Sequence, residues 1–362
     1  MSVLRRKSVE QSIRDTEQPE HRLRKDLSGL DLTVFGIGVI IGTGIFVLTG
    51  VAAHRTAGPA VALSFVVAGI ACALAALCYA EFASTVPVAG SAYTYSYATL
   101  GELVAWIIGW DLILEFVLAG ATVAVGWSQY FAVLLETIGV TLPAAVSGGA
   151  GSLFNVPATL VVLLLTAVQA VGQPFIANLI TVGALAGLTT VVMILMLGQS
   201  RVAFAMSRDG LLPRWLGRVH PRFGTPHRIT VIVGLVVAVL AGFIPLEELA
   251  ELVNIGTLFA FVLVAAAVIV LRRTRPDLPR GFRVPWGPVI PVLAMVACAV
   301  LMLFLAVATW LRFFAWMALG LLVYFLYGRH HSRLALGRQD GRRMPDQPDL
   351  DTGFGSASPP PR

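Results

Sequence analysis

The chain has 362 residues, 57% of them hydrophobic and 13% charged, and its mean hydropathy is +0.82. This composition excludes a water-soluble globular protein, and the continuous apolar stretches favour membrane-spanning helices over alternating strands. The net charge of +6 comes from 26 Lys and Arg against 20 Asp and Glu. Because the basic residues lie in a few loops and tails, they indicate membrane topology, and no nucleic-acid partner is expected.

Residues 1–30 form a polar, basic tail, which we expect in the cytoplasm. The first apolar stretch begins too late for a cleavable signal peptide. About nine apolar stretches follow, each predicting a helix able to cross the bilayer. They are residues 31–52, 60–84, 103–135, 156–172, 176–200, 229–244, 252–271, 288–310 and 313–328. The tail at 329–362 is rich in Gly, Pro and charge, so we expect disorder there. The predicted fold class is all-α, a polytopic membrane helix bundle.

The first apolar stretch contains the run GVIIGTGIF at residues 38–46. Glycine weakens a helix interior, so such a segment can open its backbone inside the membrane. Unpaired backbone groups at this depth are tolerated where they line a cavity or are buried by protein, as in the broken helices of secondary transporters. The alternative is close helix packing through Gly38 and Gly42. The run alone leaves both interpretations open.

The positions of the basic residues conflict with nine crossings. Basic residues gather in the two tails and in the loops 201–228 and 272–283, whereas the loop near Glu247 is acidic. The positive-inside rule places all four basic segments in the cytoplasm. With a cytoplasmic N-terminus, however, the last three follow an odd number of crossings. We therefore expect an odd number of crossings to be missing or in excess before residue 201, at the short uncharged junction near residues 172–174.

Asp111 and Glu115 are ionisable residues inside the third stretch, and their i, i+4 spacing puts both on one helix face. Glu115 lies nearer mid-membrane, where an ionisable group is costly and usually faces a cavity or a partner. It is a candidate contact for a substrate amine or a proton, and the alternative is a hydrogen-bonded packing residue. Asp111 is expected nearer the cytoplasmic interface.

Other conspicuous residues have simpler explanations. Tyr93, Tyr95 and Tyr97 are expected in an interfacial aromatic belt. The three cysteines lie in apolar stretches without the spacing of metal ligands, so neither a metal nor a cofactor is expected.

Three runs carry a family likeness. They are GVIIGTGIF at 38–46, VPVAGSAYTYSYATLGE at 86–102 and GQSRVAFAMSRDGLLP at 198–213. Together they resemble the amino acid permeases of the amino acid–polyamine–organocation (APC) superfamily, close to the bacterial cationic amino acid transporter branch. The third run is the most specific, because its apolar helix leads into a long, ordered basic loop. The resemblance covers about residues 25–330.

The resemblance implies a leucine-transporter-like fold, in which two inverted repeats of five helices lie within about twelve. Residues 31–172 resemble helices one to four, and residues 173–328 resemble helices eight to twelve. Helices five, six and seven have no counterpart, so the predicted bundle is an incomplete 5+5 repeat. Three absent helices would also reverse the parity of the crossings, in agreement with the charge pattern.

The resemblance also implies a substrate site. The substrate carboxylate would be held by the backbone at Ile40, Ile41, Gly42, Thr43 and Gly44, with the Thr43 hydroxyl as a further donor. Half-helix N-termini suit an anion, because their amides are unpaired and the helix dipole is positive there.

Thr189 and Thr190 resemble the helix-eight positions near the ion site of sodium-coupled relatives. The alternative is that both hydroxyls bond to carbonyls of their own helix. In proton-coupled relatives a lysine of helix five replaces the sodium ion, and here no lysine follows Lys25.

We therefore expect a multi-pass plasma-membrane permease, not an enzyme, that moves amino acids with the proton as coupling ion. The alternative is an internally deleted, transport-inactive relative that acts as a fragment or as a membrane partner subunit. The transported amino acid, the direction of transport and the oligomeric state stay open.

Overall fold

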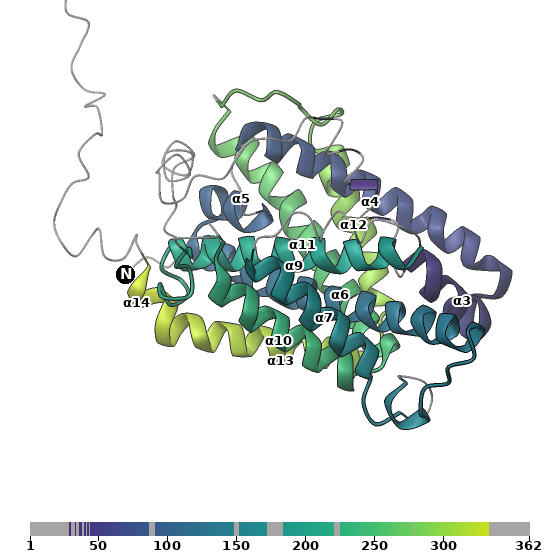
Figure 1. The fold of residues 1–362 in the computed structure, drawn as a ribbon. Helices are drawn as coiled ribbons and strands as arrows, with labels where there is room; N and C mark the ends of the chain where they lie inside the picture. Colours follow the sequence, from purple (N-terminus) through teal and green to yellow (C-terminus); the bar gives the residue numbers. More distant parts are fainter. Residues whose placement is uncertain are drawn as a thin grey trace, which may run out of the picture.

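The computed structural model describes residues 44–86, 91–147, 152–171, 184–220, 225–276 and 278–332, with isolated positions between 29 and 42. Every regular element in these ranges is helical (Figure 1). Most of the two predicted tails, residues 1–28 of the tail at 1–30 and residues 333–362 of the tail at 329–362, lies outside the described residues.

Helices make up most of the described chain. In chain order they are α3 (Thr49–Ala52), α4 (Val61–Thr85), α5 (Ser91–Thr99), α6 (Glu102–Thr137), α7 (Val156–Val171), α9 (Ala184–Arg208), α10 (His227–Phe243), α11 (Leu246–Thr274), α12 (Val289–Leu303), α13 (Val307–Val323) and α14 (Arg329–His331). Within the described ranges, α4, α6, α9, α11 and the continuous helical segment Val307–His331, which begins with α13, are long and apolar enough to cross a membrane, and α7, α10 and α12 are shorter apolar helices. The prediction of an all-α polytopic membrane bundle is confirmed.

One predicted boundary is wrong. We expected the last two stretches to be separated near Arg312, but α12 ends at Leu303 and α13 begins at Val307. The break lies in the wholly apolar segment 304–306, which carries no polar signal. Arg312 instead lies within α13, where its guanidinium pairs with Glu248 at 2.9 Å. The charge that suggested a loop therefore belongs to a contact between α11 and α13.

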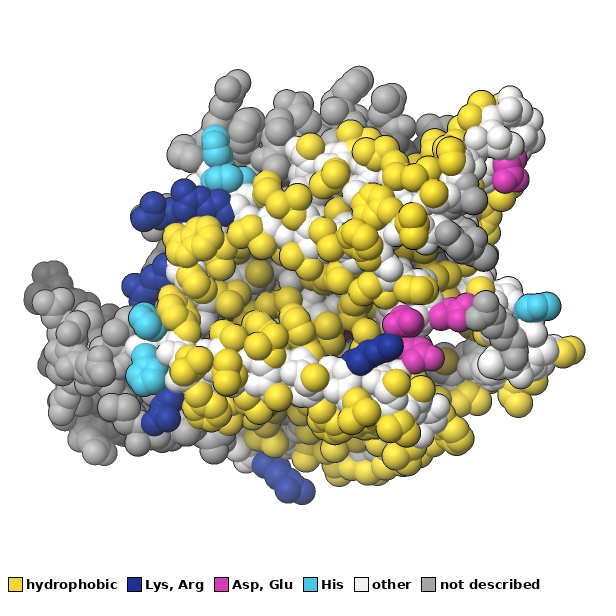
Figure 2. All heavy atoms as spheres, turned by 90° about the horizontal axis from the view of Figure 1, so that it is seen from below, with side chains coloured by type: hydrophobic (Ala, Val, Ile, Leu, Met, Phe, Trp, Pro, Cys, Tyr) yellow, Lys and Arg dark blue, Asp and Glu magenta, His cyan; other side chains and the backbone are white. Residues whose placement is uncertain are grey.

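The two ends of the bundle differ in charge. We call the end where α9 and α11 finish and α10 begins the basic end, because the loops 201–228 and 272–283 lie there. The opposite end, where α11 begins with Glu247 and Glu248, is the acidic end. Figure 2 shows most Lys and Arg side chains of one face gathered at one end, with a wide hydrophobic band between them and the acidic side chains. This distribution is the one expected of a membrane protein that obeys the positive-inside rule.

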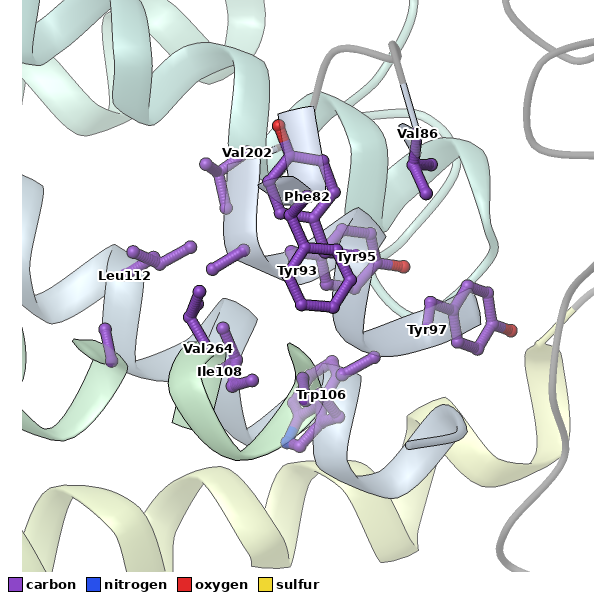
Figure 3. Packing of buried hydrophobic residues seen from close by; sticks show 14 of the residues in the cluster. Phe82, Val86, Tyr93, Tyr95, Tyr97, Trp106, Ile108, Leu112, Val202 and Val264 are labelled. Atoms are coloured by element: carbon purple, nitrogen blue, oxygen red, sulfur yellow. The ribbon is translucent and has the colours of Figure 1, made fainter. Parts of the chain in front are cut away.

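Two large apolar clusters fill most of the interior formed by the described residues, and a small third one surrounds Phe313. The first lies toward the basic end and joins α4, α5, the first half of α6, the last turns of α9 and the second half of α11 (Figure 3). The second lies toward the acidic end and joins α6, α7, α9, α10 and the beginning of α11. Tyr93, Tyr95 and Tyr97 belong to the first cluster and are buried, so the prediction of an interfacial belt is wrong. The tyrosines lie on the short helix α5, which packs against α6 and α11.

The α6 and α9 helices run antiparallel. Gly109 near the beginning of α6 lies against the Met206 side chain near the end of α9. Farther along α6, the Phe116 ring lies against Gly198, which is earlier in α9. Since α6 begins at the basic end, α9 runs from the acidic end toward the basic end. Its 25 residues correspond to about 37 Å of helix, enough to traverse the hydrocarbon core.

The α7 helix also runs from the acidic end toward the basic end. It is antiparallel to α10, because the backbone N–H of Asn155 donates to the Gly242 carbonyl at 2.9 Å, and the Thr159 hydroxyl donates to the Ala238 carbonyl at 3.3 Å. Since α10 begins at the basic end, α7 begins at the acidic end. The apolar helices α7 and α9 thus have the same direction, and only residues 172–183 separate them in the sequence. The packing of the helices therefore shows the conflict in the number of crossings that the charge pattern predicted.

Candidate functional site

The glycine-rich run departs from α-helical hydrogen bonding at Gly42. The Gly42 amide donates to the Ile40 carbonyl at 3.0 Å, and the Ile45 amide donates to the Gly42 carbonyl at 3.2 Å. An α-helix would bond each amide to the carbonyl four residues earlier. A π turn at Gly44–Leu48 follows, so the backbone changes conformation at the position where glycine makes this easiest.

The side chains and exposure of this run are described only in part. Gly42 is buried, Gly44 is exposed with open space where a Cβ would lie, and Ile40 is 82% exposed. Ile41 and Thr43 lie outside the described residues. The predicted role of this backbone in holding a carboxylate stays a prediction.

The segment that follows the run reaches the second apolar cluster. Val47 and Leu48 pack against this cluster, to which α6 contributes Val117 and α9 contributes Leu188. Thr189, the neighbour of Leu188, is buried as well. The described part of Thr190 is its helical backbone in α9, and its side chain lies outside the described set. The predicted substrate segment and the predicted coupling helix therefore share one core.

Glu115 and Asp111 on α6 both face α11. The Thr257 hydroxyl donates to Glu115 Oε1 at 2.9 Å. One residue earlier on α11, a Cβ at Gly256 would lie 3.2 Å from Asp111 Oδ1 and 3.6 Å from the Glu115 Cβ. Gly256 thus allows α11 to approach the carboxyl pair closely. The two acids share a helix face, as their spacing predicts.

Asp111 is fully buried inside the bundle. Its side chain is 0% exposed. Among the described residues, neither of its carboxyl oxygens has a hydrogen-bond partner. A buried ionised carboxylate without a partner is very costly, so this group is suited to carry a proton in the folded protein.

Two buried carboxylate centres at the basic end were missed by sequence reasoning. Glu81 at the end of α4 accepts hydrogen bonds from two nitrogens of Arg272, with Nε at 2.8 Å, and from the Val284 amide at 2.8 Å. This centre joins α4 to the end of α11 and to the loop before α12. The basic residues of that loop had been interpreted only as a topology signal, so their acidic partner on α4 went unrecognised.

The second centre involves α5. The Tyr93 hydroxyl donates to Asp209 Oδ2 at 2.8 Å, just after the end of α9. Burial raises the pKa of Tyr93 well above its usual value, and the neighbouring Asp209 charge raises it further. The tyrosine therefore stays protonated and remains the donor. The run of alternating tyrosines was the available signal for this contact, but it gave no indication of the partner.

Comparisons with known proteins identify the family of the chain. The family model for amino acid permeases matches residues 27–168 and 141–323 of the chain. The chain belongs to the amino acid permease family. Its residues are 40% identical to the branched-chain amino acid permease BcaP of Bacillus subtilis (strain 168), covering 92% of the chain and 99% of that relative. The methylthioribose transporter of the same organism is 38% identical, over 92% of the chain and 100% of the relative.

More distant relatives belong to the cationic amino acid transporters. Human cationic amino acid transporter 4 is 28% identical over 72% of this permease chain and 62% of its own length. These relatives are transporters, so the expectations of a membrane transport protein and of a non-enzyme are confirmed. The alignment with BcaP spans 462 positions, whereas the chain has 362 residues. The permease chain is therefore shorter than its relative, although it matches nearly the whole of it.

Proposed function

We propose that this chain is a proton-coupled amino acid permease of the plasma membrane, with its N-terminus in the cytoplasm. The substrate carboxylate would bind the backbone of Ile40–Gly44 and the Thr43 hydroxyl. Support comes from the change of backbone conformation at Gly42, because an interrupted helix can present amides to an anion inside a membrane.

The carboxyl pair on α6 carries the proposal of proton coupling. Glu115 lies in the bundle with a neutral hydroxyl, that of Thr257, as its hydrogen-bond donor. A carboxyl group in this setting can take up and release a proton without separating from a fixed cation. Glu115 would contact the substrate amine or carry the coupling proton, and Thr189 and Thr190 would lie at the coupling site.

Uptake of labelled amino acids by the purified chain in liposomes tests this proposal. We expect uptake driven by an inward proton gradient, lost in Gly42→Leu and no longer gradient-dependent in Glu115→Gln. Gly69→Leu is the matched control for the first variant, because Gly69 on α4 has open space around it. Glu136→Gln, at the far end of α6, is the control for the second.

A second candidate function is favoured by the connectivity. The α7 and α9 helices run in the same direction, and the residues between them are too few for further spanning helices. We propose that residues 31–172 correspond to family helices one to four and residues 173–328 to helices eight to twelve. The chain would then be an internally deleted, transport-inactive relative, present as a fragment or as a membrane partner subunit.

For the chain acting alone, the connectivity favours this second function. The helices that would complete the site, and with it an alternating-access cycle, would be absent. No uptake across a broad amino acid panel, by a chain that melts cooperatively, would support it and overturn the first. The DNA across codons 165–185 provides an independent check, because a lost coding segment would leave its junction there.

A further inference from the structure

A cavity of about 490 Å³ lies at the basic end, in the connection between α11 and α12. The connection is the green loop that leaves α11 in Figure 1. The lining residues that matter here are Arg272, Arg280, Arg283, Val284, Trp286 and Gly287. Three guanidinium groups and one indole ring therefore border a single cavity.

The cavity carries excess positive charge. Arg272 and Arg280 both approach Glu81, which is 1% exposed, so one buried carboxylate faces two guanidinium groups. Arg283 is exposed, and none of the described residues provides it with a hydrogen bond or an ion pair. An anion in the cavity would meet an unused guanidinium group and a net positive field.

The wall of the cavity is held in a defined conformation. Arg272 donates to the Val284 and Gly287 carbonyls, at 3.0 and 2.7 Å, and so spans the Val284–Gly287 segment. Trp286 between them has a φ of +56°, a left-handed conformation that a bulky residue rarely adopts. Its side chain is 76% exposed, so the strained conformation displays the indole outward instead of burying it.

An exposed apolar stripe begins beside the cavity. Val289, Val292, Val296 and Val300 on α12 are each about half exposed, and their spacing puts them along one side of the helix. Because the bundle is a membrane protein, this side faces acyl chains. Trp286 immediately precedes the stripe, and tryptophan is enriched at the level of lipid headgroups.

We propose that this cavity binds the phosphate headgroup of an anionic phospholipid of the cytoplasmic leaflet. The phosphate would lie against the exposed Arg283, within the positive field of Arg272 and Arg280. The Trp286 ring would cover the glycerol region, and the acyl chains would follow the valine stripe of α12. Basic pockets between membrane helices are suited to such headgroups. The site is independent of substrate transport and requires only that the chain be folded in a bilayer or in detergent.

Native mass spectrometry of the purified full chain tests this, with dioctanoyl phosphatidylglycerol and dioctanoyl phosphatidylcholine as probes. We expect the anionic lipid to bind about tenfold more tightly. Arg283→Gln should weaken its binding about fivefold, since one basic residue near the membrane surface contributes about that factor. Arg273→Gln is the matched control, because Arg273 is an exposed arginine of the same end that does not line the cavity.

Three outcomes would overturn the proposal. Equal binding of the two lipids would show that no anion site exists. If Arg283→Gln and Arg273→Gln weakened the binding of the anionic lipid equally, its tighter binding would result from general electrostatic attraction and not from the cavity. Binding of glycerol phosphate as tight as that of the lipid would identify a soluble phosphate as the ligand, because the acyl chains would then contribute nothing.

Discussion

Glu102, the first residue of α6, accepts hydrogen bonds from three hydroxyl groups that come from different parts of the chain. Tyr97 of α5 donates at 3.3 Å, Tyr324 after α13 at 3.1 Å, and Ser332 after α14 at 2.6 Å. The glutamate is fully buried. One carboxylate therefore holds the C-terminal end of the described chain against the beginning of α6.

Glu102→Gln should lower the free energy of unfolding by about 1–3 kcal/mol, because the charge-assisted bonds are lost and an amide N–H₂ meets hydroxyl donors. Glu136→Gln, at the exposed end of the same helix, should stay within about 0.5 kcal/mol of the parent chain. Denaturant unfolding in detergent, followed by circular dichroism, measures both. Equal effects of the two variants would contradict the structural role of Glu102.

The Thr257–Glu115 bond supports a second residue-scale prediction. Thr257→Val removes the donor while preserving shape, so Glu115 loses its hydrogen bond inside the bundle. The expected loss is about 1–3 kcal/mol of unfolding free energy, seen as a lower melting temperature in detergent. Thr274→Val is the control, since the exposed Thr274 hydroxyl bonds only to the Val270 carbonyl of its own helix. A control that melts as low as Thr257→Val would contradict the prediction.

At the scale of the elements, small residues allow helices to approach closely. On α10, a Cβ at Gly234 would lie only 2.0 Å from Thr166 Oγ1 of α7. The Thr166 hydroxyl is itself buried and bonded to the Val162 carbonyl at 2.7 Å, so it cannot simply turn away. The approach of α7 to α10 thus depends on the absence of one methyl group.

Gly234→Ala should therefore destabilise the chain by about 1–3 kcal/mol through overpacking between α7 and α10. Gly69→Ala, in the open middle of α4, should leave stability unchanged or raise it by up to about 1 kcal/mol, because alanine favours the helix. The melting temperatures of both variants in the same detergent measure this difference in stability. A Gly234→Ala chain as stable as Gly69→Ala would mean that the two helices are not in contact.

The sequence predicted some elements closely and missed others for physical reasons. The ends of α4 and α6 lie within two residues of the predicted stretches, because the length of an apolar run determines where a membrane helix ends. The break between α12 and α13 was misplaced, because segment 304–306 is as apolar as its flanks. The burial of α5 could not be predicted, since it depends on helices that are distant in the sequence.

The candidate site was likewise predicted only in part from the sequence. The i, i+4 spacing predicted correctly that Asp111 and Glu115 share a face. It could not predict their common neighbour, because Gly256 and Thr257 come from α11, more than a hundred residues away. The glycine run indicated where the backbone changes conformation, but glycine permits many conformations and does not specify which one forms.

For the whole molecule, the parity of the membrane crossings determines on which side of the membrane each loop lies. The charge pattern predicted that the number of crossings before residue 201 disagrees with the positive-inside rule. The packing of α7 and α9 agrees with this prediction, because both helices run from the acidic end to the basic end. In an ordinary bundle, successive spanning helices alternate in direction. The loop before α7 and the loop after α9 would then lie on the same side of the membrane.

Cysteine labelling in whole cells distinguishes these arrangements. With the three natural cysteines replaced by alanine, Val140→Cys reports on the loop before α7, and Arg218→Cys reports on the loop after α9; both positions are exposed. We expect a membrane-impermeant maleimide to label Val140→Cys in intact cells and Arg218→Cys only after permeabilisation, because parallel α7 and α9 put these loops on opposite sides. Phe304→Cys, in the exposed turn between α12 and α13, should behave like Val140→Cys. Labelling of Val140→Cys and Arg218→Cys in intact cells, with Phe304→Cys labelled only after permeabilisation, would mean that α7 and α9 alternate in the membrane, and the parallel packing would then be wrong.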